Sequence, residues 1–275
     1  MSAFAATVRA ADRTAYLATL FAPEVARPAL LALAAYGLEL TRIVTRANDP
    51  VAAEIRLQWW RDAIRNEGFG EGAGVPLVTA LREAANRFAW PLDTLCTISE
   101  GRIHDLYADP FADFDAFDGY AGEVFGAPLQ LGAMAVSIAR LGEASGLAAA
   151  RTAASAAGYG GVVLCTQDAL HGEAARLLVG RTHGPQTAWQ SAGVADLPAR
   201  LNAGAGAPPP LAALRDHGQR AADAFWRAAD ATAPEARSAL ILAGAATRGL
   251  SRCAPPGPFR AQLRLWRAAR QLRPL

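Results

Sequence analysis

The chain has 275 residues, of which 52% are hydrophobic and 19% charged, and its formal net charge is +2. This mild charge argues against a nucleic-acid partner, because nucleic-acid-binding domains concentrate far more positive charge. The cysteines Cys96, Cys165 and Cys253 lie far apart without metal-ligand spacing, so we expect reduced core thiols in a cytoplasmic protein. Abundant Ala and Leu and sparse β-branched residues predict an all-α protein with a sizeable core.

The N-terminal segment lacks the apolar stretch of a signal peptide, because Arg9, Asp12 and Arg13 interrupt it. No uninterrupted apolar run reaches the roughly 18 to 20 residues that a membrane-spanning helix needs. We therefore expect a protein that is soluble or at most peripheral at a membrane. A first helix is predicted over residues 3–20, with Pro23 following its end.

The stretch from Leu30 to Thr45 is the most informative and reads LLALAAYGLELTRIVT. Its apolar residues recur at helical spacing, whereas Thr41 and Thr45 stand one above the other near its end. This pattern predicts a helix whose last turns face something other than the core. A further helix is expected over 51–66. The glycine-rich loop at 68–74 that follows lacks the preceding strand and the lysine of a phosphate-binding loop.

Asp105 and Asp109 lie four residues apart, so they share one face of the helix that begins near Pro91. Two interpretations are open for this pair. It could contribute to a metal site, or it could mark a helix end that enters a loop at Pro110. We favour the helix end, because a metal site needs a matching pair of carboxylates elsewhere.

The remaining chain predicts further helices over 113–141, 147–170, 211–229 and 234–248, with an irregular segment over 173–210. The first of these contains Pro128, which predicts a kink. The last segment, at about 257–275, is a basic amphipathic helix. Either this helix packs on the body of the protein with its arginines in solvent, or it attaches to an anionic membrane surface.

Several stretches occur in an order that resembles one protein family. They are YLATLFAP (Tyr16 to Pro23), the stretch from Leu30 to Thr45, IRLQWWRDAI (Ile55 to Ile64), EGRIHDLYADP and GYAGEVFGA. Together they resemble the squalene and phytoene synthases, and most closely the aspartate-poor branch that includes the mitochondrial complex I assembly factor. The resemblance implies a single domain over 1–275, an isoprenoid-synthase-like helical bundle with a central cavity.

Active members of this family hold magnesium through two aspartate-rich motifs, and both motifs are altered here. In the register of Asp-Asp-x-x-Asp the chain has Thr41, Arg42 and, at the last position, Thr45. In the register of Arg-Asp-x-x-x-Asp it has Gln167 and His171 at the aspartates, with Asp168 one residue out of register. Neutral and imidazole side chains cannot hold a magnesium cluster in the usual way. We expect the altered positions Thr41, Thr45, Gln167 and His171 to face one another across the cavity.

The resemblance also implies a set of substrate-binding positions. They are Tyr16, Tyr36, Arg42, Tyr120, Gly122 and Gln167. Two functional hypotheses follow. The first is a pseudoenzyme without a cofactor that binds a prenyl diphosphate or another lipid, or a partner protein, in the cytoplasm or peripherally at the inner membrane. The alternative is an active head-to-head prenyltransferase that holds Mg²⁺ at an altered site, for which Asp105, Asp109 and Asp168 are the available ligands.

Overall fold

The computed structural model describes residues 4–65, 74–194, 196–197, 210–252 and 254–272, and every regular element in these ranges is a helix. The all-α prediction is therefore confirmed. The predicted loop at 68–74 lies almost entirely outside the described residues. The α-helices are α1 (Ala5–Ala11), α2 (Arg13–Thr19), α3 (Arg27–Thr45), α4 (Pro50–Arg65), α5 (Pro76–Phe88), α6 (Leu92–Gly101), α7 (Phe114–Ala121), α8 (Ala127–Leu141), α9 (Glu143–Arg151), α10 (Ala154–Leu177), α11 (Gln186–Ser191), α13 (Leu211–Asp230), α14 (Ile241–Thr247) and α15 (Pro258–Leu272).

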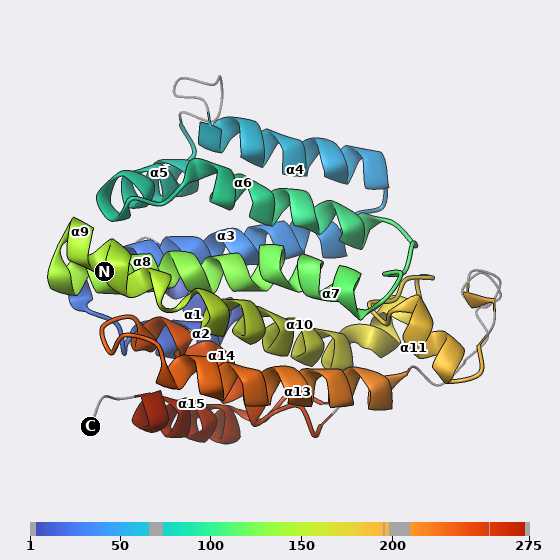
Figure 1. The fold of residues 1–275 in the computed structure, drawn as a ribbon. Coiled ribbons are helices and arrows are strands. Elements are labelled where there is room, and N and C mark those ends of the chain that lie inside the picture. The colour runs from blue at the N-terminus through green and yellow to red at the C-terminus, as the bar shows by residue number, and fades with distance from the viewer. Residues whose placement is uncertain (1–3, 66–73, 195, 198–209, 253, 273–275) are drawn as a thin grey trace.

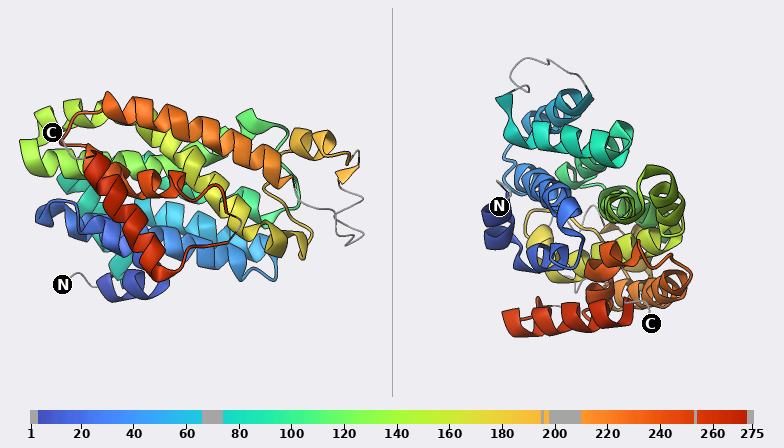
Figure 2. Two further views of the ribbon diagram at one scale, coloured as in Figure 1. Left: turned by 90° about the horizontal axis from the view of Figure 1, so that it is seen from below. Right: turned by 90° about the vertical axis from the view of Figure 1, so that its left-hand side faces the viewer.

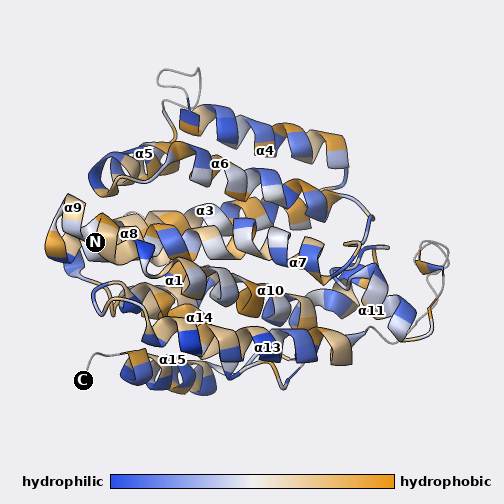
Figure 3. Ribbon diagram, viewed as in Figure 1, coloured by the Kyte–Doolittle hydropathy of each residue, from blue (hydrophilic) through white to orange (hydrophobic). Residues whose placement is uncertain are grey.

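The helices stack in successive layers. In Figure 1, α4 and α6 lie on one side, α3 and α8 in the middle, and α10, α13 and α15 toward the opposite side. The two views in Figure 2 agree that α15 covers the outside of the bundle. Figure 3 shows mainly hydrophobic residues along α8, whereas hydrophilic and hydrophobic residues alternate along the outer helices α4 and α15. This alternation is the pattern of helices that bury one face only.

The largest part of the core lies between α3, α4, α5, α6 and α8 and contains several aromatic side chains. Tyr36 and Trp60 pack together there, with their ring centroids 5.4 Å apart. The Tyr36 hydroxyl donates to the carbonyl of Leu95 at 3.1 Å, and the Trp90 indole donates to the carbonyl of Leu131 at 2.8 Å. These bonds satisfy the polar atoms that the two rings carry into the core.

The first predicted helix, 3–20, is two helices separated at Asp12. The Asp12 carboxylate accepts a hydrogen bond from the amide of Ala15 at 2.9 Å and so caps α2. Its own backbone amide still donates to the carbonyl of Val8 at 2.7 Å, at the end of α1. The Asp12 side chain accepts a hydrogen bond from a backbone amide and so ends one helix and starts another.

The predicted helix 113–141 is continuous in direction but contains a π-helical turn, Gly122–Gly126, between α7 and α8. Pro128 follows this turn. Because a proline has no N–H to donate to the carbonyl four residues before it, we attribute the interruption to Pro128. At the same place α10 approaches very closely, because a Cβ built on Gly161 would lie only 2.6 Å from the amide nitrogen of Gly126. The glycines here serve helix-to-helix packing.

The second half departs from prediction mainly at its boundaries. The predicted helix 147–170 is α9 followed by α10, and α10 continues to Leu177, so the irregular segment begins later than expected. The predicted helix 234–248 is a 3₁₀ turn, Arg237–Leu240, followed by α14. Leu177 in the last turn of α10 packs against Trp189, Val194 and Leu197, contacts that the local sequence pattern does not show.

Two segments, Glu24–Thr45 and Phe114–Leu141, are long and apolar enough to cross a membrane by length and composition alone. In these segments 50% and 56% of the most apolar window is buried inside the bundle. This burial is what core helices show, and these two segments supply much of the wall of the cavity described next.

Candidate functional site

A cavity of about 540 Å³ runs between α2, α3, α8, α10, α14 and α15. Most of its wall is apolar, with side chains such as Leu33, Leu129 and Leu242. One group of polar side chains, the polar end, lies where the C-terminal halves of α3 and α10 meet the 3₁₀ turn Arg102–Leu106 and α15. It consists of Thr41, Arg102, Gln167, Asp168, His171 and Arg264. Asp12, Thr14, Thr19 and Ser238 also line the cavity. The shape and lining suit an amphiphile with a polar head and an apolar tail.

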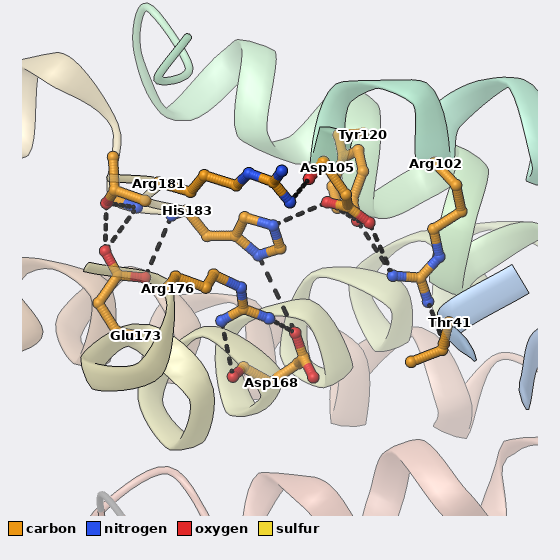
Figure 4. A network of polar contacts seen from close by, with 11 residues as sticks. Thr41, Arg102, Asp105, Tyr120, Asp168, Glu173, Arg176, Arg181 and His183 are labelled. Carbon is orange, nitrogen blue, oxygen red and sulfur yellow. Dashed lines mark hydrogen bonds and ion pairs between the residues drawn. The ribbon is translucent and has the colours of Figure 1, made fainter. Parts of the chain in front are cut away.

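Behind this polar end, Asp105 is the centre of a buried network (Figure 4). Its carboxylate accepts hydrogen bonds from the Tyr120 hydroxyl at 2.8 and 2.9 Å and from Arg102 Nη1 at 3.0 Å. His183 Nε2 lies 2.8 Å from Asp105 Oδ1, and the side chains of His183 and Asp105 are only 5% and 6% exposed. Arg102 then reaches the cavity, where its Nη2 lies 3.4 Å from the hydroxyl of Thr41.

The other half of the network holds Asp168, which lines the cavity. Arg176 pairs with the Asp168 carboxylate and also donates to its backbone carbonyl at 3.3 Å. His183 Nδ1 lies 3.9 Å from the same carboxylate, so His183 stands between Asp105 and Asp168. Glu173 anchors the loop that carries this histidine, because it accepts hydrogen bonds from the Thr182 hydroxyl and, at 3.1 Å, from the amide of His183.

The electrostatic balance of the network favours ionised Asp105. Burial alone would raise the pKa of this carboxyl, but the hydrogen bond from His183 and the charges of His183 and Arg102 outweigh burial and hold the pKa well below its usual range. Burial raises the pKa of Tyr120 well above its ordinary value, so its hydroxyl stays protonated and donates. Burial lowers the pKa of Arg102, but the nearby Tyr120 and Asp105 raise it by more, so Arg102 stays charged.

A second polar group lies at the cavity wall between α10 and α15. A Cβ built on Gly249 would lie 2.9 Å from Arg264 Nη1 and would also overlap the amide of Gln167, so a glycine lets these two side chains approach. No carboxylate of the described residues pairs with Arg264, and its pKa is lowered by burial and by the neighbouring Arg252 and Arg260. His171 Nε2 is buried and has no hydrogen-bond partner in the described part of the chain.

The sequence model of the squalene/phytoene synthase family matches residues 8–270. The chain belongs to this family. Two solved structures share its fold: squalene synthase HpnC from Alicyclobacillus acidocaldarius (17% identity, TM-score 0.64, 89% of each chain covered) and a dehydrosqualene synthase in complex with ligand (15% identity, TM-score 0.67, 96% of this chain and 93% of that one covered). The expected isoprenoid-synthase-like helical bundle is confirmed. No curated protein sequence matches significantly.

Three of the four altered motif positions line the cavity: Thr41, Gln167 and His171. The prediction is wrong for Thr45, which is exposed and donates its hydroxyl to the carbonyl of Thr41 at 2.8 Å. Arg42 also lies outside the cavity. Its side chain is 56% exposed and pairs with Glu39, because one residue along a helix turns the side chain by about 100° from Thr41.

Four other predicted substrate-binding residues do not line the cavity. Tyr36 is fully buried in the core, and Tyr120 lies behind the cavity wall, bound to Asp105. Tyr16 packs against α1 and α3 in a small apolar cluster, although its neighbours Ala15 and Thr19 do line the cavity. Gly122 belongs to the π-helical turn and does not reach the cavity. Of this set only Gln167 lines the wall.

The carboxylates that could hold magnesium do not converge. Asp105 is enclosed by Arg102, His183 and Tyr120, and Asp109 is exposed outside the cavity. Asp168 does line the cavity, but it is paired with Arg176. Nowhere in the described ranges do three His, Cys, Asp or Glu side chains form a group that could hold a metal ion. Magnesium needs several oxygen ligands, so this donor set does not fit it.

Sequence reasoning missed the residues that give the polar end its charge. Arg102 and Arg264 line the cavity, yet they come from a 3₁₀ turn and from the last helix. His183 comes from the segment that was predicted to be irregular, and it lies between two acidic side chains. The available signal was the pair of stretches EGRIHD and RTHG, in which charged residues and histidine interrupt apolar neighbours.

Proposed function

We propose that this member of the squalene/phytoene synthase family binds a prenyl diphosphate, or another lipid with an anionic head, without converting it. The observation that carries the proposal is the charge at the polar end of the cavity. Arg102 and Arg264 line it together with Asp168, whose carboxylate is bound by Arg176. The other acidic side chain on the cavity wall, Asp12, caps α2. An anion is attracted to such a surface, and a divalent cation is not.

The chemistry of the family supports the same proposal. Ionising a prenyl diphosphate requires divalent cations that neutralise the leaving diphosphate, and such ions need converging carboxylates. Thr41, Gln167 and His171 supply none of these ligands. Arginine can bind phosphate in a fork and remains charged, so it can hold a diphosphate in place without cleaving it.

We place the two parts of the ligand in different regions of the cavity. Arg264, with Gln167 and the unpartnered Nε2 of His171 beside it, would hold the anionic head. Burial lowers the pKa of His171 more than Asp168 raises it, so at neutral pH this side chain is a neutral hydrogen-bonding group. Leu33, Leu129 and Leu242 would surround the tail. In this role the protein would act in the cytoplasm or at the inner membrane, delivering lipid to, or assembling with, a partner protein.

The alternative is an active prenyltransferase with an altered magnesium site. One observation favours it: Asp105 and Asp168 belong to the same network, joined through His183 at 2.8 and 3.9 Å. For these carboxylates to bind magnesium together, Arg102, Arg176 and His183 would have to leave them. Because removing a partner from a buried ion pair is costly, this rearrangement is unfavourable.

Incubation with farnesyl or geranylgeranyl diphosphate and magnesium, followed by product analysis, tests catalysis directly. We expect the diphosphates to be recovered unchanged, and any condensed hydrocarbon product would refute the proposal. Titration calorimetry tests binding. Arg264→Gln should weaken binding of the diphosphate about tenfold or more, since a hydrogen bond to a charged group contributes about 1.5–3 kcal/mol. Arg42→Gln is the matched control and should bind like the wild type; equal losses in both variants would contradict the assignment.

A further inference from the structure

A second hollow, of about 380 Å³, lies on the outside of the bundle between α2 and α15. Its lining is almost entirely apolar and consists of Leu17, Leu20, Phe21, Phe259, Gln262, Leu263, Leu265 and Trp266. We call these residues the α2–α15 groove. Three of them are strongly exposed: Phe259 by 79%, Trp266 by 54% and Leu20 by 43%. Exposed large side chains that gather in one place mark a binding surface.

Positive charge surrounds this groove. From Pro258 to Leu272, α15 contains no acidic residue and has arginines at 260, 264, 267 and 270. None of these arginines has a carboxylate partner in the part of the chain that the structure describes. At 100° per residue, Phe259, Leu263, Trp266 and Arg270 share one side of the helix, and Arg260 and Arg267 are adjacent to it. The guanidinium of Arg270 lies 5.6 Å from the centroid of the Trp266 ring.

We infer that the α2–α15 groove docks on an anionic phospholipid surface. The argument is complementarity of two kinds. Phe259, Trp266 and Leu20 supply apolar tips of the kind that enter the boundary between head groups and acyl chains. The flanking arginines supply the charge that anionic head groups attract. The opposite side of α15 holds the helix to the body, because Leu265, Ala268, Ala269 and Leu272 are buried there.

The placement of α15 gives this docking a consequence. Ala261 and Arg264 of the same helix line the main cavity, whereas Phe259 and Trp266 line the groove. A single helix, α15, therefore contributes to both the cavity and the proposed membrane-facing surface. A lipid that leaves the bilayer would meet the arginines of α15 before it enters the cavity. The inference concerns the outer surface and does not depend on whether the cavity is catalytic.

Co-sedimentation of the full chain with vesicles tests the inference. The vesicles are phosphatidylcholine with or without phosphatidylglycerol. We expect binding only to vesicles that contain phosphatidylglycerol, and weaker binding as salt increases, because salt screens surface charge. Replacing Arg260, Arg267 and Arg270 with Gln should weaken binding by about fivefold for each arginine, given the usual attraction of one basic residue to an anionic membrane.

A second variant isolates the apolar part. The double substitution Phe259→Ser and Trp266→Ser should weaken binding at least tenfold. Its matched control is Val51→Ser with Ile55→Ser on α4, where the side chains are 61% and 65% exposed on the other side of the bundle. Thermal melts verify that every variant is folded. The inference would be overturned if the wild type bound equally well to vesicles with and without phosphatidylglycerol, or if the α4 control lost as much vesicle binding as the double substitution. The inference would also be overturned if the wild type were a dimer and the double substitution dissociated that dimer without changing vesicle binding.

Discussion

Asp105→Asn tests the buried network most directly. The substitution keeps the shape of the side chain but removes the charge that faces Arg102 at 3.0 Å and His183 at 2.8 Å. Arg102 is then a buried cation without a counterion, a change that typically costs about 3–5 kcal/mol. At about 2–4 °C for each kcal/mol in a chain of this size, we expect the melting temperature to fall by about 10 °C. Differential scanning calorimetry at neutral pH measures this shift.

Two comparisons decide whether the charge is responsible. Asp109→Asn changes an exposed carboxylate on the same segment and should leave the melting temperature nearly unchanged. The pKa of Asp105 is lower in the folded protein than in the unfolded chain, so its contribution is fully present above about pH 4 and is lost as the pH falls further. The difference in melting temperature between wild type and Asp105→Asn should therefore become smaller below about pH 4. A variant as stable as wild type at neutral pH would refute the reasoning.

Two further predictions concern close packing and ligand binding. Gly161→Ala should lower the free energy of unfolding by about 1–3 kcal/mol in urea denaturation, because its Cβ would lie 2.6 Å from the amide nitrogen of Gly126. Gly158→Ala should be neutral or stabilising, because its Cβ would meet nothing within 4 Å beyond its own stretch of helix, and equal effects would contradict the packing argument. A prenyl diphosphate should raise the melting temperature equally with magnesium or with a chelator. Stabilisation that requires magnesium would instead support the altered metal site.

The fold was accessible from the sequence because local patterns encode it. The helix expected over Leu30 to Thr45 is present as α3, Arg27–Thr45, and the helix expected over 211–229 is present as α13, Leu211–Asp230. Errors occur where a single side chain changes the outcome. Asp12 ends one helix and caps the next. The periodicity of apolar residues does not show that its side chain competes with continuation of the helix.

Part of the cavity wall was also predictable, because the family resemblance implies which helices meet at the cavity and helix register fixes which residues share a face. Thr41 on α3 and the pair Gln167 and His171 on α10 line one cavity as expected. Register also explains the two exceptions. Arg42 is turned by about 100° from Thr41, and Thr45, although nearly in line with it, lies at the helix end beyond the cavity.

The charges at the polar end could not be predicted in the same way, because they come from segments distant in sequence. Arg102 contacts Thr41 across 61 residues, and His183 contacts Asp105 across 78. Such contacts exist only after the helices have packed. The family resemblance therefore placed the altered motif positions, but it could not reveal that Asp105 and Asp168 each have an arginine partner.

These pairings decide what the cavity attracts. Each acidic side chain near the polar end, Asp105 or Asp168, is matched by an arginine, whereas Arg264 has no carboxylate partner in the described residues. Among Arg102, Asp105, Asp168, Arg176 and Arg264 the surplus charge is therefore positive, and α15 carries it. Asp12, which also lines the cavity, caps α2. Because the same helix carries Trp266 and Arg270 on its outer side, the two proposed attractions, of an anionic head group to the cavity and of the protein to an anionic bilayer, would have a common structural origin.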